Sequence, residues 1–315
     1  MKKSGKALFL TFALLTAAVL CGCGPAAEGG VNFPDRNLEA AIREAINIPS
    51  GAICSSDLSE LTFLDASNRG IMELDGLQHC VNLELLDLSE NKIDDIQPLS
   101  GLAKLTELNL YSNQISDVSL LATLTNLLKL YLDDNQVTDI SSLSYLINLE
   151  KLFLDGNGIT DISPLSGLTE LTQLSLVENE IDDISPLSNM VNMEVLDLFD
   201  TQISDISPLS NLSKLRILSL ELNNVDDISP LSESTAMTML RLGGNNIRDI
   251  NPLSAMTSLE NLQLKSNEIS DIKPLLENTG LSDGDLVNLT DNPLSDESIN
   301  TYIPKLEDRG VRVGY

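Results

Sequence analysis

The sequence predicts an α/β repeat solenoid, in which short coils stack so that their strands form one parallel sheet. Three observations predict it. A 22-residue unit recurs nine times without insertion over residues 83–280, after a degenerate unit at 61–82. Counted from Leu83 as position 0, positions 3 and 5 are Leu in all nine units. Positions 10, 13, 16 and, in most units, 19 are apolar and three residues apart. A fixed period indicates one elongated body, although the length of 315 residues would otherwise suggest about two domains.

The spacing within a unit predicts its local structure. Positions 3 and 5 are two residues apart, so their side chains leave a β-strand on the same side. The later apolar positions keep a spacing of three, which an α-helix does not maintain but a 3₁₀ or extended backbone does. We therefore expect each unit to contain one short strand, a turn, and a 3₁₀ or extended return.

Two polar positions fit the same coil. Position 8 is Asn in eight of the nine units, and an Asn amide can bond backbone groups of its own and adjacent coils. Position 12 is Asp in all nine, where it can accept backbone N–H groups in an Asx-type turn. The following Ser and Pro suggest the cap and first residue of a helical turn. The recurrent segment DISPLS is therefore interpreted as scaffold.

The pattern LxxLxLxxNxIxDIxPLxxL resembles the 22-residue leucine-rich repeat of bacterial internalin-type proteins. The resemblance covers ten repeats over residues 61–280. It implies a leucine-rich repeat horseshoe with a parallel concave β-sheet, a 3₁₀ or extended convex side, a helical N-cap and an α/β C-cap. The chain lacks an LPxTG-like sortase signal, and no immunoglobulin-like domain follows the repeats, so host invasion, known for some internalins, is not carried over.

The segments that flank the repeats suggest caps that cover the apolar ends of the array. Residues 33–60 are expected to form the N-terminal helical cap, with Asp35 as the helix N-cap and Pro49 after its end. One face of that helix would carry Leu38, Ala41, Ile42, Ala45 and Ile46. Residues 281–315 would form the C-terminal cap, with a helix that starts near Ser295, is interrupted by Pro304, and ends near Gly310.

The N-terminus indicates targeting. Three lysines precede an apolar stretch that is short for a membrane span, and residues 1–22 are interpreted as a signal peptide. The segment LCGC resembles the lipobox of bacterial lipoproteins, which implies acylation of Cys23 and a short tether over residues 23–32. An ordinary cleaved signal or an uncleaved anchor are the alternatives. The resemblance implies a membrane-anchored lipoprotein on the extracytoplasmic side of a bacterial cell envelope.

Cysteine usage leaves one question open. Of the four cysteines, Cys54 and Cys80 lie outside the N-terminal targeting segment and its LCGC sequence. A disulfide between them is possible, but the preferred interpretation is two small buried apolar residues.

Composition and motifs argue against several functions. A net charge of −28 argues against nucleic-acid binding. The single histidine, His79, has no neighbours with metal-ligand or triad spacing, and no P-loop, HExxH or G-x-S-x-G motif occurs. The segment DGDLVN at 283–288 lacks the full pattern of a calcium loop and is interpreted as a turn of the C-cap. The chain has many carboxylates, so their number alone does not exclude a pair of catalytic acids like that of glycosidases. We expect no enzyme, cofactor or metal site.

Function is expected from positions 2, 4 and 6, which alternate with the buried leucines and face the concave side. Aromatic and apolar residues gather there beside acidic ones, as in a protein-binding surface with a charged rim. The alternative interpretation is that these are β-favouring residues on a sheet with no partner. The second functional hypothesis is glycan or cation binding by the acidic rim. A monomer that binds a protein partner is predicted, with these candidate residues: Tyr111, Tyr131, Phe153, Val177, Val195, Phe199, Ile217, Met239, Asp133, Asp155, Asp197 and Glu221.

Overall fold

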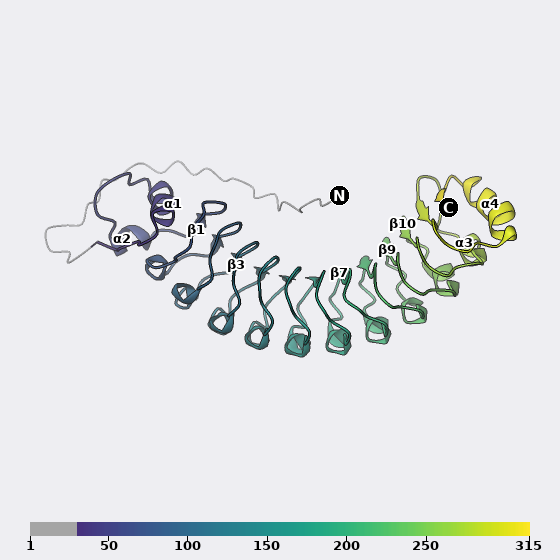
Figure 1. The fold of residues 1–315 in the computed structure, drawn as a ribbon, viewed down its shortest axis with the longest axis horizontal. Helices are drawn as coiled ribbons and strands as arrows, with labels where there is room; N and C mark the ends of the chain where they lie inside the picture. The colour runs from purple at the N-terminus through teal and green to yellow at the C-terminus, as the bar shows by residue number, and fades with distance from the viewer. Residues whose placement is uncertain (1–29) are drawn as a thin grey trace.

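The computed structural model describes residues 30–315, which form a curved stack of coils (Figure 1). The strands line the inner side of the arc, and the 3₁₀ turns line the outer side. All strands belong to one parallel sheet, ordered from β1 to β12 as in the sequence. They are β1 (Phe63–Asp65), β2 (Leu85–Asp87), β3 (Glu107–Asn109), β4 (Lys129–Tyr131), β5 (Lys151–Phe153), β6 (Gln173–Ser175), β7 (Val195–Asp197), β8 (Ile217–Ser219), β9 (Met239–Arg241), β10 (Asn261–Gln263), β11 (Leu286–Asn288) and β12 (Arg312–Gly314). The predicted solenoid is confirmed.

The register has no shift between repeats. Leu130 pairs with Leu152, and Leu152 with Leu174, so equal repeat positions lie side by side. The constant 22-residue period produces this directly, because each coil returns to the same point one strand further along the sheet. Each repeat position therefore becomes a column that runs along the solenoid.

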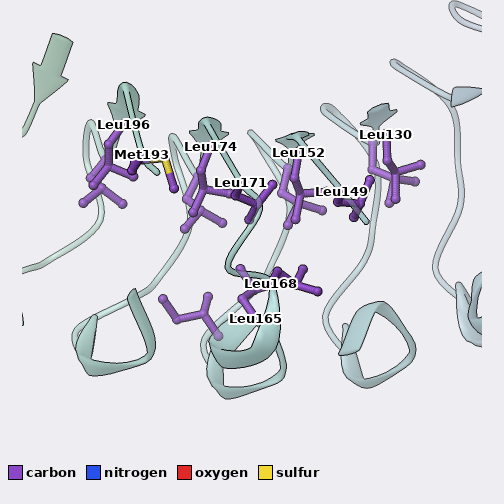
Figure 2. Close-up of a cluster of buried hydrophobic side chains, with 14 of the residues drawn as sticks. Leu130, Leu149, Leu152, Leu165, Leu168, Leu171, Leu174, Met193 and Leu196 are labelled. Atoms are coloured by element: carbon purple, nitrogen blue, oxygen red, sulfur yellow. The ribbon is translucent and has the colours of Figure 1, made fainter. Parts of the chain in front are cut away.

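The predicted apolar columns form the core. In Figure 2, Leu152 points from its strand toward the return of the coil, where Leu165 and Leu168 lie. These three side chains are completely buried. Truncation of one such Leu to Ala costs about 2–5 kcal/mol.

The 3₁₀ turns are η1 to η9, but their caps differ from the prediction. They are η1 (Leu77–His79), η2 (Gln97–Leu99), η3 (Ser119–Thr123), η4 (Ser141–Tyr145), η5 (Ser163–Gly167), η6 (Ser185–Asn189), η7 (Ser207–Asn211), η8 (Ser229–Leu231) and η9 (Asn251–Ala255). In η5 the Ser163 N–H donates to the Asp161 carboxylate at 2.7 Å, and Ser163 is the first residue of the turn. The predicted Asx-type bond of Asp at position 12 is therefore confirmed, but the prediction that Ser is the cap is wrong, because Ile162 is the residue at the N-cap.

The Asn column is a hydrogen-bonded ladder, as predicted. Asn113 donates to the carbonyl groups of Leu88 on the preceding coil and Leu110 on its own coil, both at 3.0 Å. Its side-chain oxygen accepts the Ile93 N–H at 3.0 Å. Thr201 takes the place of Asn in one coil, and its hydroxyl reaches Leu198 and Asn223. Within residues 30–315, the Thr201 side chain has no hydrogen bond to the coil before it.

Position 7 adopts the left-handed conformation along the array. In the coil of β2, Glu90 has φ of 56°, and its N–H donates to the Tyr111 carbonyl of the next coil at 2.8 Å. Leu222 has φ of 57° at the equivalent place and is half exposed. A β-carbon in this conformation is unfavourable, so the continuous hydrogen bonding between coils outweighs a local backbone cost.

The N-terminal cap contains α1 (Arg36–Ile46) and α2 (Ser55–Leu58). Asp35 caps α1 as predicted, and its other oxygen accepts the Met72 N–H at 2.7 Å, which ties the cap to the first coil. Burial of Asp35 opposes ionisation, but four backbone N–H donors outweigh it and lower the pKa of the carboxyl. The predicted apolar face is too wide, because Ala45 is exposed and Ile46 only half-buried.

The C-terminal cap contains two further strands, β11 and β12, and the helical segment of η10 (Ser298–Tyr302) and α4 (Ile303–Glu307). A short helix, α3 (Lys273–Glu277), precedes it in place of a 3₁₀ turn. The prediction that Pro304 interrupts the helix is wrong. A π-turn, η10, immediately precedes α4, and Pro304 lies in the first turn of α4. The wider turn accommodates the missing N–H of Pro304 and its ring. Within the predicted turn 283–288, the last three residues form β11.

The two cysteines are not bonded to each other. Cys80 is a free, fully buried thiol, and burial raises its pKa to about 12. Cys54 is also buried. The predicted burial of both residues is confirmed, and the alternative of a disulfide between them is wrong. The predicted signal peptide and Cys23 lie outside the described residues.

Candidate protein-binding face

The structure places the candidate residues along the inner side of the arc. Positions 2 and 4 lie within the strands, and position 6 is the second residue after each strand ends. All twelve side chains are half-buried, with neither a fully buried nor a freely exposed one among them. Partial burial fixes the orientation of a side chain and still leaves part of it accessible to a partner.

Two aromatic rings form the most ordered feature of the face. Tyr131 and Phe153 are register partners on β4 and β5. Their ring centroids are 5.0 Å apart, and the ring planes are inclined by 6°. Burial, together with the negative charges of Glu107 and Asp133, raises the pKa of Tyr131 to about 12. The pair presents two fixed aromatic edges, since each ring restricts the other.

Tyr111 does not join this stack. It occupies position 6, two residues beyond Asn109, which is the register partner of Tyr131. Burial, and the charge of the nearby Asp134, raise the pKa of Tyr111. Of the candidate residues Tyr111, Tyr131 and Phe153, only the last two thus form a stacked pair, and Tyr111 lies near Asp134.

An apolar column lies further along the sheet. Val195, Ile217 and Met239 are consecutive register partners on β7, β8 and β9. Val177 and Phe199 occupy position 6 of adjacent coils, on the other side of the position-4 column. All five are candidates from the sequence, and the unshifted register places neighbouring members of one column side by side.

Several carboxylates of the face have structural partners. The N–H of Asp155 donates to the Asp133 carboxylate at 2.9 Å. Asp155 in turn accepts the Val177 N–H at 2.9 Å and the Ser175 hydroxyl at 2.5 Å. Asp197 accepts the N–H of Phe199 at 3.2 Å. These acids therefore satisfy backbone groups where the strands end, in addition to contributing negative charge.

Two of these carboxyl groups have raised pKa values. Burial, followed by the charge of Asp155, raises the pKa of Asp133 to about 7. Burial also raises the pKa of Asp155 to about 6, and the charge of Asp197 adds to this. Hydrogen bonds act in the opposite direction but do not outweigh desolvation. Negative charge on this part of the face therefore increases as the pH rises from about 6 to about 7.

Sequence reasoning missed two residues of the face. Phe63 on β1 is 49% exposed, and it is the register partner of Leu85 at position 2. Extending the position count to the degenerate first repeat would have identified it. Asp87 is 5% exposed and accepts hydrogen bonds from both the N–H and the hydroxyl of Ser89. The residue type alone does not tell whether an aspartate at this position is buried, as Asp87 is, or belongs to the acidic rim.

The face offers no constellation for metal chemistry in the part of the chain that the structure describes. Residues 30–315 contain no group of three or more His, Cys, Asp and Glu side chains that could hold a metal ion. His79 is half-buried within η1. No helix among these residues is both long and apolar enough to cross a membrane.

A family model described as Leucine Rich repeats (2 copies) matches residues 59–101, 103–145, 147–189, 191–233 and 235–277, which is more than half of the chain. No curated protein matches the chain in sequence.

Solved structures extend the comparison. An internalin (inlF) from Listeria monocytogenes is 29% identical with a TM-score of 0.64, over 90% of this chain and 95% of that one. An internalin C2 from the same organism is 39% identical with a TM-score of 0.63, over 65% and 92% of the two chains. The ectodomain of an Arabidopsis thaliana receptor kinase, solved in complex with CASPARIAN STRIP INTEGRITY FACTOR 2, is 20% identical with a TM-score of 0.66, over 82% and 36%, and shares the fold alone. The chain therefore belongs to the leucine-rich repeat family and is an internalin-type leucine-rich repeat protein.

Proposed function

We propose that this protein is a non-catalytic binding protein that captures a protein partner on its concave sheet. The observation that carries the proposal is the alignment of aromatic and apolar side chains in columns, above all the stacked Tyr131–Phe153 pair. Rigid, partly exposed aromatic rings lose little conformational freedom on binding and often dominate interface energies. The leucine-rich repeat family consists largely of protein-interaction scaffolds, which supports the same function.

We further propose that the protein is a monomeric lipoprotein. It lies on the extracytoplasmic side and is anchored to the bacterial membrane through acylated Cys23. The lipobox-like segment before Cys23 supports this anchor. The test is metabolic labelling with an alkyne fatty acid, with Cys23→Ser as the variant. If the wild-type chain is labelled and the Cys23→Ser variant loses both the label and its association with the membrane fraction, the anchor is supported. An unlabelled wild-type chain contradicts it.

The binding function is tested by crosslinking on intact cells and mass spectrometry of the captured proteins. Separate Tyr131→Ala, Phe153→Ala and Phe199→Ala variants are expected to reduce capture of the same partner by about ten-fold or more. Thermal unfolding of each variant shows that the array remains folded. Unchanged capture by all three variants would contradict binding through this face.

A matched control changes exposed apolar residues elsewhere. Tyr145 and Ile147 are 64% and 58% exposed and lie around the end of η4, on the convex part of the coil. Tyr145→Ala and Ile147→Ala are expected to leave capture unchanged. Equal loss in these controls would indicate a general effect of surface hydrophobicity and would contradict a concave site.

A further inference from the structure

The position-4 column changes character beyond the aromatic pair. Ser175 and Ser219 are the register partners of Asp197 on its two neighbouring strands. They are 7% and 2% exposed, whereas Asp197 is half-buried. Because a serine side chain is short, the Asp197 carboxylate stands between two low points of the sheet.

Apolar residues lie near Asp197 along its own coil and on the next strand. Val195 and Ile217 lie at position 2 of the same and the next strand, and Phe199 follows Asp197 at position 6. We name these residues the Asp197 patch: Ser175, Val195, Asp197, Phe199, Ile217 and Ser219. An ionic contact within such surroundings is stronger than one in open water, because the local dielectric is lower.

The Asp197 carboxylate has no cationic partner within residues 30–315. The salt bridges there involve Arg43, Arg69, Lys129, Arg248 and Lys273. Arg241 occupies the same column two strands away, on β9, without a salt bridge to Asp197. From the part of the chain that the structure describes, Asp197 accepts one hydrogen bond, which comes from the N–H of Phe199. Capacity for further donors therefore remains.

A second carboxylate adds to the negative charge. The bonds that Asp155 accepts from Ser175 and Val177 direct it toward β6, the strand between it and Asp197. The electrostatic influence of Asp197 on Asp155 raises the pKa of the latter, after the larger effect of burial. The two acids thus repel each other across Ser175, and an incoming cation would relieve that repulsion.

We propose that the Asp197 patch receives a lysine or arginine side chain of the protein partner. The alkyl stem of such a side chain packs against Val195, Ile217 and Phe199, and its charged end meets Asp197. The net charge of −28 also favours approach of a basic surface. This inference rests on the proposed function, since it names the partner's chemistry at one part of the same face.

The experiment pans a random peptide library displayed on phage against the purified mature chain, immobilised through its N-terminus. Enriched sequences are expected to contain Lys or Arg next to apolar residues. Synthetic versions then replace Arg by citrulline, or Lys by norleucine, which keep the length of the side chain and remove its charge. Affinity is expected to fall about ten-fold to a hundred-fold, as for loss of a charged hydrogen bond.

Two variants of the chain complete the test. Asp197→Asn preserves the shape of the side chain and is expected to reduce binding of the cationic peptide by the same factor, with little effect on the neutral peptide. Glu194→Gln is the matched control, because Glu194 is an exposed carboxylate on the same coil. It is expected to change affinity by less than about two-fold, as an exposed charge does.

The outcomes separate the two proposals. Enriched peptides without a cation, or cationic peptides insensitive to Asp197→Asn, overturn the lysine or arginine inference. If such peptides still lose binding on Phe153→Ala and Phe199→Ala, the concave binding function stands. If no peptide is enriched, or none responds to any of these variants, the result counts against both.

Discussion

The N–H of Val177 donates a 2.9 Å hydrogen bond to the carboxylate of Asp155 on the preceding coil. The same relationship joins the N–H of Asp155 to Asp133, also at 2.9 Å. Two consecutive junctions between coils are therefore closed by acidic side chains at position 6. The residues that give the concave face its charge also help to hold its strands together.

Removal of the Asp155 carboxylate is expected to destabilise the fold. Asp155→Ala leaves the Val177 N–H and the Ser175 hydroxyl without this acceptor, which costs about 1–3 kcal/mol of unfolding free energy. Asp155→Asn retains a side-chain oxygen and is expected to cost less. Urea denaturation measures both, and equal stability of the alanine variant and the wild type would contradict the structural role.

Stability is expected to depend on pH through Asp133 and Asp155. Their folded pKa values of about 7 and about 6 lie above the ordinary value of 3.8, so the folded state binds more protons between these limits. The associated stability is present below about pH 4 and is lost as the pH rises toward 7. Asp133→Asn is therefore expected to raise the thermal unfolding midpoint at pH 7.5 more than at pH 4.5.

Other carboxyl groups oppose this trend only at lower pH. The pKa of Asp35 is lowered by its N–H donors despite burial, so the stability it contributes is lost as the pH falls below about 4. Measurements between pH 4.5 and 7.5 avoid that range. A flat profile across this window in the wild type would contradict the proposed contribution of Asp133 and Asp155.

Restoration of the Asn ladder is expected to stabilise the array. Thr201 lacks the hydrogen bonds that an Asn makes to the preceding coil, so Thr201→Asn should add about 1 kcal/mol of unfolding free energy. Asn179→Thr is the converse change, because Asn179 donates to Leu154 on the preceding coil at 3.0 Å. It should cost about 1–3 kcal/mol. A loss of stability for Thr201→Asn together with a gain for Asn179→Thr, measured by chemical denaturation, would contradict the interpretation of the ladder.

Relief of the backbone cost at Leu222 is also expected to stabilise the fold. Its φ of 57° is unfavourable for Leu, and Asn tolerates this conformation better. Leu222→Asn is expected to raise the unfolding free energy by about 0.5–1 kcal/mol. Leu222→Ala removes the same exposed apolar group but keeps the β-carbon, so it should not stabilise. Equal gains in both variants would attribute the effect to surface polarity instead.

Periodic positions made most of the architecture predictable. Leu152 and Leu174 occupy the same repeat position, and a constant period places them as neighbours whatever the details of the turns. The amide of Asn113 has both a donor and an acceptor, so its role between coils also followed from its chemistry. A repeat specifies each contact many times, which makes such contacts readable from one chain.

Features that depend on a single neighbour could not be predicted in this way. Ser163 and Asp161 both carry side-chain oxygens that suit a cap, and only the structure shows that Ser163 begins the turn while the Asp161 carboxylate accepts its N–H. The accommodation of Pro304 depends on a π-turn, which has no sequence signal here. Within the face, composition identified Asp155 as an acid on the rim, but its bond to Val177 arises from another coil.

The unshifted register sets fixed distances between positions on the concave sheet, in multiples of one strand spacing. The aromatic pair ends on β5 and Asp197 lies on β7, so their separation is two strand spacings of about 4.7–4.9 Å each. Duplication or deletion of one whole 22-residue coil between them would change this separation by one strand spacing, while the Asn ladder and the core re-form across the new junction. Partner recognition by such a sheet can therefore be re-spaced only in whole steps, independently of the side chains that make the contacts.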